Sequence, residues 1–234
     1  MAQRIISYQG HDFPIAYDFI HHQSEQNIAF LHGWGSNKEI MKLAFERYFP
    51  QYNHCYIDLP GFGRSPNEQT LNTQDYAEIM QRFFHALDIT PQLVFGHSFG
   101  GKVATLLPYP IILLSSAGIL EKKPLKVRLK ILLAKLCKSL YLNTSFMRSK
   151  DAKNLNQGMY NTFKNVVNED FTPHFANFEQ KAVIFWGKQD SATSLSSGEK
   201  ISKLIKNSRF YALEGDHYFF LKQGDMIEKL YFKE

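Results

Sequence analysis

One serine in this 234-residue chain stands in a motif suited to nucleophilic chemistry. Residues 96–100 have the sequence GHSFG and follow an apolar run, Leu93–Phe95, which is typical of a sharp turn from a strand into a helix. Such a turn exposes the hydroxyl group of Ser98 and directs the backbone N–H of Phe99 towards an oxygen that becomes negative during acyl transfer. We therefore expect Ser98 to be a nucleophile and Phe99 to be one oxyanion donor. The alternative is a glycine-rich turn that carries an incidental serine.

A serine hydroxyl is a weak nucleophile, so it needs a histidine base that is oriented by a carboxylate. In this class of motif the acid and then the histidine follow the serine along the chain. Asp190 lies in FWGKQDS after an apolar run, and His217 lies in LEGDHYFF after a β-prone run, so we expect them to fill these roles. Glu214 and Asp216 are rival acids, but both are so close in sequence to His217 that they would have difficulty reaching the correct ring nitrogen.

A second oxyanion donor is expected from the loop after an earlier strand. The segment LHGWG, residues 31–35, occupies that place, and we expect the backbone N–H of Trp34 to be the donor. The side chains of Trp34 and Phe99 are expected to contact the acyl part of a substrate, although a turn without chemistry is the alternative. A second glycine-rich turn, DLPGFGRS at residues 58–65, lacks the lysine of a phosphate-binding loop. His97, beside the serine, is expected to pack or to hydrogen-bond beneath the turn.

Buried strands and an amphipathic helix must hold these residues. Two short strands around Gly10 predict a hairpin at the beginning of the chain. Apolar side chains at helical spacing predict a helix over residues 76–87. Apolar runs bounded by turn residues, a pattern of strands buried on both faces, occur at residues 28–31, 55–57, 93–95, 111–114 and 182–185. Strands that alternate with helices predict an α/β fold with a mainly parallel sheet flanked by helices.

The alternation is interrupted between residues 119 and 180, where no strand is evident. Leucines at helical spacing from Leu125 to Leu140 predict a helical cap over this segment, inserted into one domain. The core would then comprise residues 1–118 and 181–234. One α/β domain accounts for a chain of this length.

The basic residues are concentrated in the predicted cap. Residues 121–150 contain nine basic residues and one acidic residue, whereas the remainder contains 18 basic and 21 acidic residues. Such a local cluster favours docking of an acidic partner over nucleic-acid binding, although a solvated helix face is the alternative. The expected partner contacts stand near the start of the cluster: Lys122, Lys123, Lys126, Arg128 and Lys130.

Composition and cysteine use exclude several classes of protein. The chain is 44% hydrophobic and 21% charged, which is typical of a globular protein. Its longest nearly apolar stretch, residues 109–120, is shorter than the ~18 residues needed to span a bilayer. We expect a cytoplasmic protein, since no secretory signal is apparent, with Cys55 and Cys137 reduced and structural. Metal-ligand spacing is not apparent, so we expect neither a metal nor a cofactor.

Together the motifs HGWG, DLPGFGRS, GHSFGG, WGKQDS and the DH at residues 216–217 resemble the α/β-hydrolase superfamily. This resemblance implies the α/β-hydrolase fold with a catalytic triad of Ser98, Asp190 and His217. Within the superfamily, HGWG, DLPGFGRS and WGxxDS are most similar to the pimeloyl-[acyl-carrier protein] methyl ester esterases of biotin synthesis. That similarity implies attack by Ser98 on a methyl ester, release of methanol, and acyl carrier protein as the partner. Tyr218 and Phe219 depart from the family pattern, in which a small residue and proline commonly follow the histidine.

Other functions are compatible with the same motifs. The triad motifs also resemble those of carbon–carbon bond hydrolases that act on ring-cleavage dienoates, and a general short-chain carboxylesterase is a further alternative. In a different class, the basic cap would be a membrane-surface or protein-docking module carried on a hydrolase scaffold. The motifs define neither the acyl-chain length nor the oligomeric state.

Overall fold

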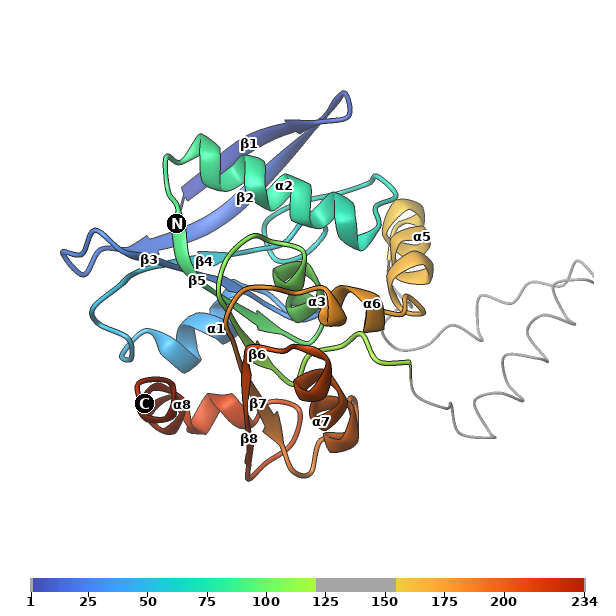
Figure 1. The fold of residues 1–234 in the computed structure, drawn as a ribbon. Helices are drawn as coiled ribbons and strands as arrows, with labels where there is room; N and C mark the ends of the chain where they lie inside the picture. The colour runs from blue at the N-terminus through green and yellow to red at the C-terminus, as the bar shows by residue number, and fades with distance from the viewer. Residues whose placement is uncertain (1, 121–154, 234) are drawn as a thin grey trace, which may run out of the picture.

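Eight strands form one sheet in the computed structural model, which describes residues 2–120 and 155–233 (Figure 1). The strands are β1 (Ala2–Tyr8), β2 (His11–Ile20), β3 (Asn27–Leu31), β4 (Asn53–Ile57), β5 (Pro91–His97), β6 (Ile111–Leu114), β7 (Ala182–Gly187) and β8 (Ser208–Leu213). Their order across the sheet is β1-β2-β4-β3-β5-β6-β7-β8. The β1–β2 and β2–β4 pairs are antiparallel, and all other pairs are parallel. This is the mainly parallel sheet that the sequence predicts.

The predicted hairpin around Gly10 joins β1 to β2. Tyr8 pairs with His11, so the loop contains only Gln9 and Gly10. Both residues have positive φ, 49° and 78°. This backbone matches the twist of the two strands, and glycine adopts it without a steric penalty.

The parallel strands end at one edge of the sheet, which we call the carboxyl edge. The pairing register brings the end of β3 beside β5, the end of β5 beside β6, and the end of β7 beside that of β8. The segments that follow β3, β5, β7 and β8 therefore all begin at this edge. They carry Trp34, Ser98, Asp190 and His217, respectively.

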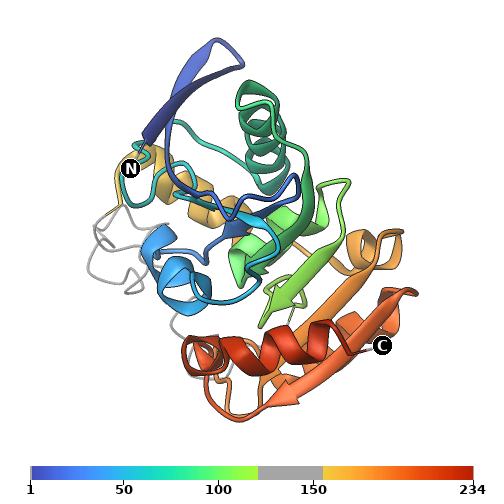
Figure 2. The same cartoon turned by 90° about the vertical axis from the view of Figure 1, so that its left-hand side faces the viewer.

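Helices cover both faces of the sheet. They are α1 (Lys38–Phe45), α2 (Thr73–Ala86), α3 (Phe99–Thr105), α5 (Gln157–Val166), α6 (Thr172–Ala176), α7 (Leu195–Leu204), the 3-10 helix η3 (Phe219–Lys222) and α8 (Gly224–Tyr231). Apolar side chains of α1, η3 and α8 form one buried cluster, and those of α2, α3 and α7 belong to another. Figure 1 shows α1 and α8 on one side of β6–β8 and α7 on the other, and Figure 2 turns α1 and α8 towards the viewer. Among the described helices, none is long and apolar enough to cross a membrane.

Helix α2 confirms the predicted helix and begins three residues earlier. The side chain of Asn72 accepts a hydrogen bond from Asp75 N, and the side chain of Asp75 accepts one from Asn72 N. This reciprocal capping box satisfies backbone donors that the first turn leaves unpaired. The apolar face used for the prediction, including Tyr76 and Phe83, is fully buried.

The predicted cap, residues 119–180, is described only in part. Helices α5 and α6 lie in its second half, and Thr162 of α5 accepts a hydrogen bond from Leu71 N through Oγ1 at 2.8 Å. Residues 121–154 lie outside the described residues, so the boundaries of cap and core stay a prediction. The segment outside the description includes the leucine stripe, Cys137, and the expected partner contacts Lys122, Lys123, Lys126, Arg128 and Lys130.

Candidate active site

Ser98 joins β5 to α3 in a strained backbone conformation. Its φ is 50° and its ψ is −112°, and non-glycine residues rarely adopt positive φ. A Cβ atom on Gly96 would lie 2.6 Å from the carbonyl oxygen of Gly100, and one on Gly100 would lie 2.4 Å from that of Leu31. Larger residues at either glycine would force the helix away from the strands. The two glycines therefore permit the sharp turn that presents the serine.

Asp190 and His217 form a hydrogen-bonded pair. His217 Nδ1 lies 2.7 Å from Asp190 Oδ2, and a carboxylate can only accept, so Nδ1 carries the proton. Asp190 Oδ1 accepts from the backbone N–H groups of Ala192 and Thr193 at 2.8 and 3.0 Å. Burial opposes ionisation of Asp190, but hydrogen bonds from His217 and Thr193 outweigh it and lower the pKa of Asp190 to about 2. The carboxylate is therefore charged at neutral pH, and it can orient the imidazole.

The two rival acids are engaged elsewhere. Glu214 is exposed and forms an ion pair with Lys188 at 2.5 Å and a hydrogen bond with Gln189 at 2.8 Å. Asp216 accepts a hydrogen bond from the backbone N–H of Tyr218 at 2.8 Å. Glu214 thus pairs with the loop after β7, and Asp216 with the turn before η3, whereas Asp190 bonds to His217 Nδ1.

His97 places His217 beside the serine turn. It is the last residue of β5 and directly precedes Ser98. Its Nε2 lies 3.1 Å from the backbone oxygen of His217, and the centroids of the two rings are 4.6 Å apart. The residues expected to be nucleophile, base and acid are thus brought to one part of the carboxyl edge.

His32 fixes the loop that carries Trp34. Its Nε2 accepts from the backbone N–H of Leu59 at 3.1 Å, and its Nδ1 donates to the Gly33 carbonyl at 2.8 Å. Burial lowers the pKa of His32 to about 4, so the ring is neutral near pH 7. Because C=O and N–H point in opposite directions across a trans peptide, this bond also sets the direction of the Trp34 N–H. The motif LHGWG gives no indication of this role of His32, because the partner Leu59 lies in a distant loop.

Aromatic side chains surround the indole of Trp34. Its ring centroid lies 4.8 Å from Phe62, 5.5 Å from Phe99 and 5.3 Å from Phe163. These rings come from the turn after β4, from the start of α3 and from α5. An apolar wall therefore adjoins the two residues expected to supply oxyanion donors, and their contact with substrate stays a prediction.

Asp58 closes the glycine-rich turn DLPGFGRS. The side chain is buried, and its oxygens accept from the backbone N–H groups of Lys38 at 2.7 Å and Arg64 at 3.0 Å. A Cβ atom on Gly63 would lie 2.3 Å from the Asp58 carboxyl carbon. This turn carries Phe62 to the aromatic wall, so its function here is structural.

Lys102 is another buried charged residue, and no sequence motif indicates its burial. It lies in α3, only 2% exposed, and its Nζ donates to the Val166 carbonyl at 2.8 Å and to Glu169 at 2.6 Å. The ammonium group also lies 4.4 Å from the centre of the Phe171 ring. Lys102 therefore joins the helix behind Ser98 to the end of α5.

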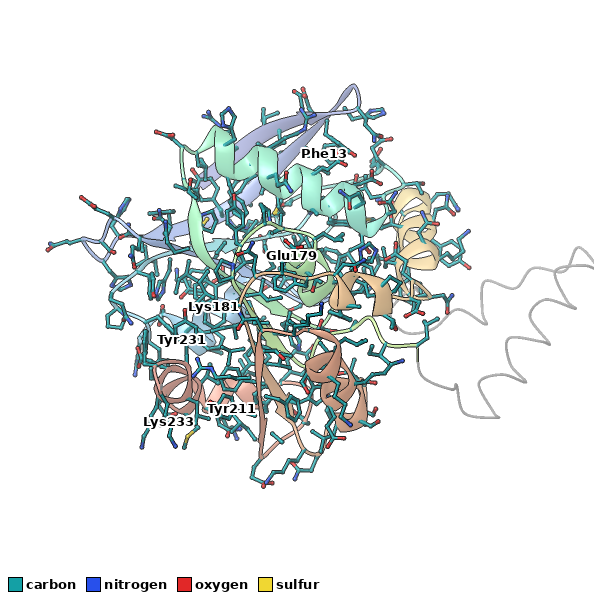
Figure 3. The ribbon with its side chains drawn as sticks, viewed as in Figure 1. Phe13, Glu179, Lys181, Tyr211, Tyr231 and Lys233 are labelled. Carbon is teal, nitrogen blue, oxygen red and sulfur yellow. The ribbon has the colours of Figure 1, made fainter. Side chains whose placement is uncertain are left out.

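The residues that the structure describes form no metal centre, and a large cavity lies away from Ser98. Within residues 2–120 and 155–233, no group of three or more His, Cys, Asp or Glu side chains could hold a metal ion. A cavity of about 630 Å³ lies at the opposite edge, where the parallel strands begin, and Lys181, Tyr231 and Lys233 line it (Figure 3). Ser98, Asp190 and His217 do not line this cavity.

Comparison with known proteins defines the family. Residues 28–197 match the model of the alpha/beta hydrolase family. The chain belongs to this family. An esterase from Exiguobacterium antarcticum has the same fold, with a TM-score of 0.76 over 97% of both chains at 17% sequence identity.

More similar sequences cover only part of the chain. It is 33% identical over 36% of its length to a pimeloyl-[acyl-carrier protein] methyl ester esterase of Photorhabdus laumondii, of which the match covers 30%. It is 32% identical over 42% of its length to a Mycoplasma pneumoniae protein whose name describes an esterase or lipase, of which 37% is covered. The chain thus matches about a third of the length of these relatives.

Proposed function

We propose that this protein is a serine carboxylesterase in which Ser98, His217 and Asp190 form a catalytic triad. The observation that carries the proposal is the strained turn at Ser98 placed beside a histidine whose Nδ1 bonds to a buried carboxylate. That bond leaves His217 Nε2 as the basic nitrogen of the neutral ring. Membership of the alpha/beta hydrolase family supports the same assignment.

The first half of the reaction forms an acyl-enzyme. Ser98 Oγ attacks the ester carbonyl carbon while His217 Nε2 takes the hydroxyl proton. The carbonyl oxygen becomes negative and accepts hydrogen bonds from the backbone N–H groups of Trp34 and Phe99. The ester C–O bond then breaks, and the alcohol leaves with the proton from His217.

The second half regenerates the serine. His217 takes a proton from water, and the hydroxide attacks the acyl carbon of the Ser98 ester. Collapse of the second tetrahedral intermediate releases the carboxylic acid, and His217 returns the proton to Ser98 Oγ. No cofactor is required, because water and the ester supply every atom.

Replacement of the serine tests this chemistry. Ser98→Ala removes the atom that forms the acyl bond, and we expect ester hydrolysis to fall by ~10⁶-fold. The measurement is kcat for a p-nitrophenyl ester per folded molecule, with Ser7→Ala, an exposed serine in β1, as a control. Equal activity of wild type and Ser98→Ala would place the nucleophile at another residue.

We further propose that the substrate is the methyl ester of a pimeloyl-type acyl chain on acyl carrier protein, and that the protein acts in the cytoplasm in biotin synthesis. Its similarity to pimeloyl-[acyl-carrier protein] methyl ester esterases supports this assignment. The nine basic residues between positions 121 and 150 fit an acidic carrier protein, and the aromatic wall around Trp34 fits an alkyl chain. Growth without biotin, restored in cells that lack their own pimeloyl-ester esterase, is the expected genetic result.

Charge reversal in the predicted cap tests the carrier protein as partner. We expect the triple reversal of Lys122, Lys126 and Arg128 to Glu to lower kcat/KM for the carrier-linked ester, because charges at a docking surface control encounter rate. Turnover of a small soluble ester is expected to stay within about two-fold, or ~0.4 kcal/mol at the barrier. High salt is expected to slow only the carrier-linked substrate, since the Debye length shortens from ~10 Å at 0.1 M to ~3 Å at 1 M.

A matched reversal elsewhere controls for net charge. Lys200, Lys203 and Lys206 are exposed in and after α7, and their reversal to Glu changes the net charge equally. If both triple variants lose equal activity on the carrier-linked ester, net charge alone is responsible. If the cap reversal slows both substrates, damage to the protein is responsible, and if it slows neither, the basic residues do not bind the carrier.

A further inference from the structure

His97 connects the strand of the nucleophile to the backbone of the base. It is only 1% exposed, and its Nε2 lies 3.1 Å from the His217 carbonyl oxygen. A carbonyl can only accept, so Nε2 carries the proton and donates it. Because β5 lies in the centre of the sheet, this bond fixes the His217 backbone to a rigid part of the molecule.

The other ring nitrogen of His97 faces the loop of the expected oxyanion hole. A Cβ atom on Gly33 would lie 2.9 Å from His97 Nδ1 and 3.1 Å from Ser98 Cβ. Judged by the described part of the chain, Nδ1 is buried without a hydrogen-bond partner. Proteins pair nearly all buried polar atoms, so an unpaired one calls for an explanation. The bond from Nε2 to the His217 carbonyl explains the unpaired Nδ1, because that bond fixes the tautomer of the ring and turns Nδ1 towards Gly33.

The ring of His97 also packs against side chains of the segment that begins at His217. Ring centroids lie 4.6 Å from His217, 5.1 Å from Tyr218 and 4.8 Å from Phe220. Burial lowers the pKa of His97 to about 3, so the ring is neutral at the pH of the proposed reaction. His97 therefore contacts the base without adding a positive charge beside it.

We propose that His97 is a positioning residue, which holds His217 within reach of Ser98 through the Nε2–H bond to the His217 carbonyl and through ring contacts. The inference rests on the proposed roles of Ser98 and His217. His97 transfers no proton and touches no substrate. Its loss is therefore expected to lower the rate of chemistry and to leave substrate binding unchanged.

Two variants of His97 distinguish the effect of losing the hydrogen bond from the effect of changing the volume of the side chain. His97→Phe keeps a planar ring but removes the donor, whereas His97→Gln keeps an N–H near the position of Nε2. His54→Phe is the matched control, because His54 is also a buried sheet histidine whose Nε2 bonds to a backbone carbonyl, that of Phe49 at 3.0 Å. Its ring packs against Phe30 and Tyr56 of the buried cluster of α1 and α8, and its ring contacts include neither Ser98 nor His217.

The kinetic measurement is the rate constant for phosphonylation of Ser98 by a fluorophosphonate, together with kcat and KM for a small ester, each per folded molecule. We expect His97→Phe to lower the phosphonylation rate and kcat by about 100-fold, the loss typical of an ångström-scale misplacement, with KM within about two-fold. His97→Gln is expected to recover at least a tenth of the wild-type rate, and His54→Phe to retain the wild-type rate. Wild-type rates in His97→Phe, equal losses in both His97 variants, or a change confined to KM would overturn the proposal.

The bond itself is tested in the wild-type protein without any turnover. In ¹⁵N-histidine NMR, we expect His97 to show a protected Nε2–H and an unprotonated Nδ1 throughout pH 5 to 8. A proton on Nδ1, or titration of His97 in this range, would contradict the positioning role even if both Phe variants failed to fold. If the NMR and phosphonylation results hold but no carboxylic ester is hydrolysed, the proposed ester substrate is wrong and His97 keeps its role.

Discussion

The carboxyl edge of the sheet and the aromatic layer beneath α1 and α8 share strand β5 but are stabilised in different ways. At the edge, Ser98 and Ser115 have positive φ values of 50° and 44°, and glycines permit approaches that a Cβ atom would block. In the aromatic layer, Phe30 and Phe95 are fully buried with ring centroids 4.6 Å apart, and Phe45 lies 4.9 Å from Phe95. The edge depends on individual hydrogen bonds, and the layer depends on apolar contact.

The alternation of side chains along β5 explains how the two regions meet. Phe95 and His97 face the same side of the sheet, because side chains two residues apart share a face. Phe95 contacts other rings of the layer, whereas His97 lies at the end of the strand and bonds to the His217 backbone. We therefore expect substitutions at the edge to impair activity more than stability, and substitutions in the layer to do the opposite.

Of the substitutions that compare the two regions, Asp190→Asn is expected to give the largest effect and to act on activity alone. The amide would present a donor to His217 Nδ1, so the imidazole would take the tautomer that has its proton on Nε2 and could not act as a base. We expect kcat for a small ester to fall by ~10⁴-fold, or ~5 kcal/mol, with a nearly unchanged melting temperature.

The matched control is Glu214→Gln, which alters an exposed carboxylate on the same turn as His217. It is expected to stay within about two-fold of wild type, because an exposed ion pair contributes little. Activity retained in Asp190→Asn and lost in Glu214→Gln would move the acid to position 214.

Phe45→Ala is expected to have the next largest effect and to act on stability. Phe45 of α1 is fully buried against Phe30, Phe95 and Phe220, so its removal leaves a cavity in the aromatic layer. We expect the free energy of unfolding to fall by about 3–5 kcal/mol in urea titration, with an unchanged kcat per folded molecule.

Leu43 on the same helix is 72% exposed and provides the comparison. Leu43→Ala is expected to change the free energy of unfolding by less than about 0.5 kcal/mol. A loss of kcat in folded Phe45→Ala would show that the layer and the carboxyl edge are coupled.

Mild acid is expected to lower the stability of the aromatic layer by less than Phe45→Ala does. Burial lowers the pKa of His54 from 6.5 to about 4, so below pH 6.5 the unfolded chain binds a proton that the folded protein does not. Stability therefore falls as the pH falls, by about 2 kcal/mol from this histidine between pH 7 and pH 5.

Urea titrations at both pH values measure this contribution. His54→Gln is expected to remove it from the difference between pH 7 and pH 5, whereas replacement of the exposed His11 with Gln is expected to leave that difference as in wild type. The same difference in wild type and His54→Gln would show that His54 is protonated in the folded protein.

The strands and the serine turn could be predicted because their signals are local. An apolar run such as Ile111–Leu114 gives the strand with the bounds observed, and two glycines around Ser98 indicate the sharp turn whatever the rest of the fold. The pairing of Asp190 with His217 was expected from chain order, since both follow strands that end at the same edge. These inferences need no knowledge of which distant side chains touch.

Buried charged and polar residues could not be predicted, because their surroundings come from distant segments. Lys102 resembles an ordinary surface lysine until the end of α5 supplies Val166 and Glu169 as acceptors. The sequence shows Asp58 only as part of a glycine-rich turn, whereas in the fold its oxygens accept hydrogen bonds from the backbone N–H groups of Lys38 and Arg64. In both cases the sequence contains the residue, but the partner that allows its burial is known only from the fold.

The central claim is that Ser98 is a nucleophile activated by His217. Mass spectrometry of peptides after reaction with a fluorophosphonate tests this claim most directly, in wild type, Ser98→Ala and His217→Ala. We expect one adduct in the wild type, on the peptide that contains Ser98, no adduct in Ser98→Ala, and labelling slowed by at least about 10³-fold in His217→Ala. An adduct on another serine, or wild-type labelling rates in His217→Ala, would contradict the account.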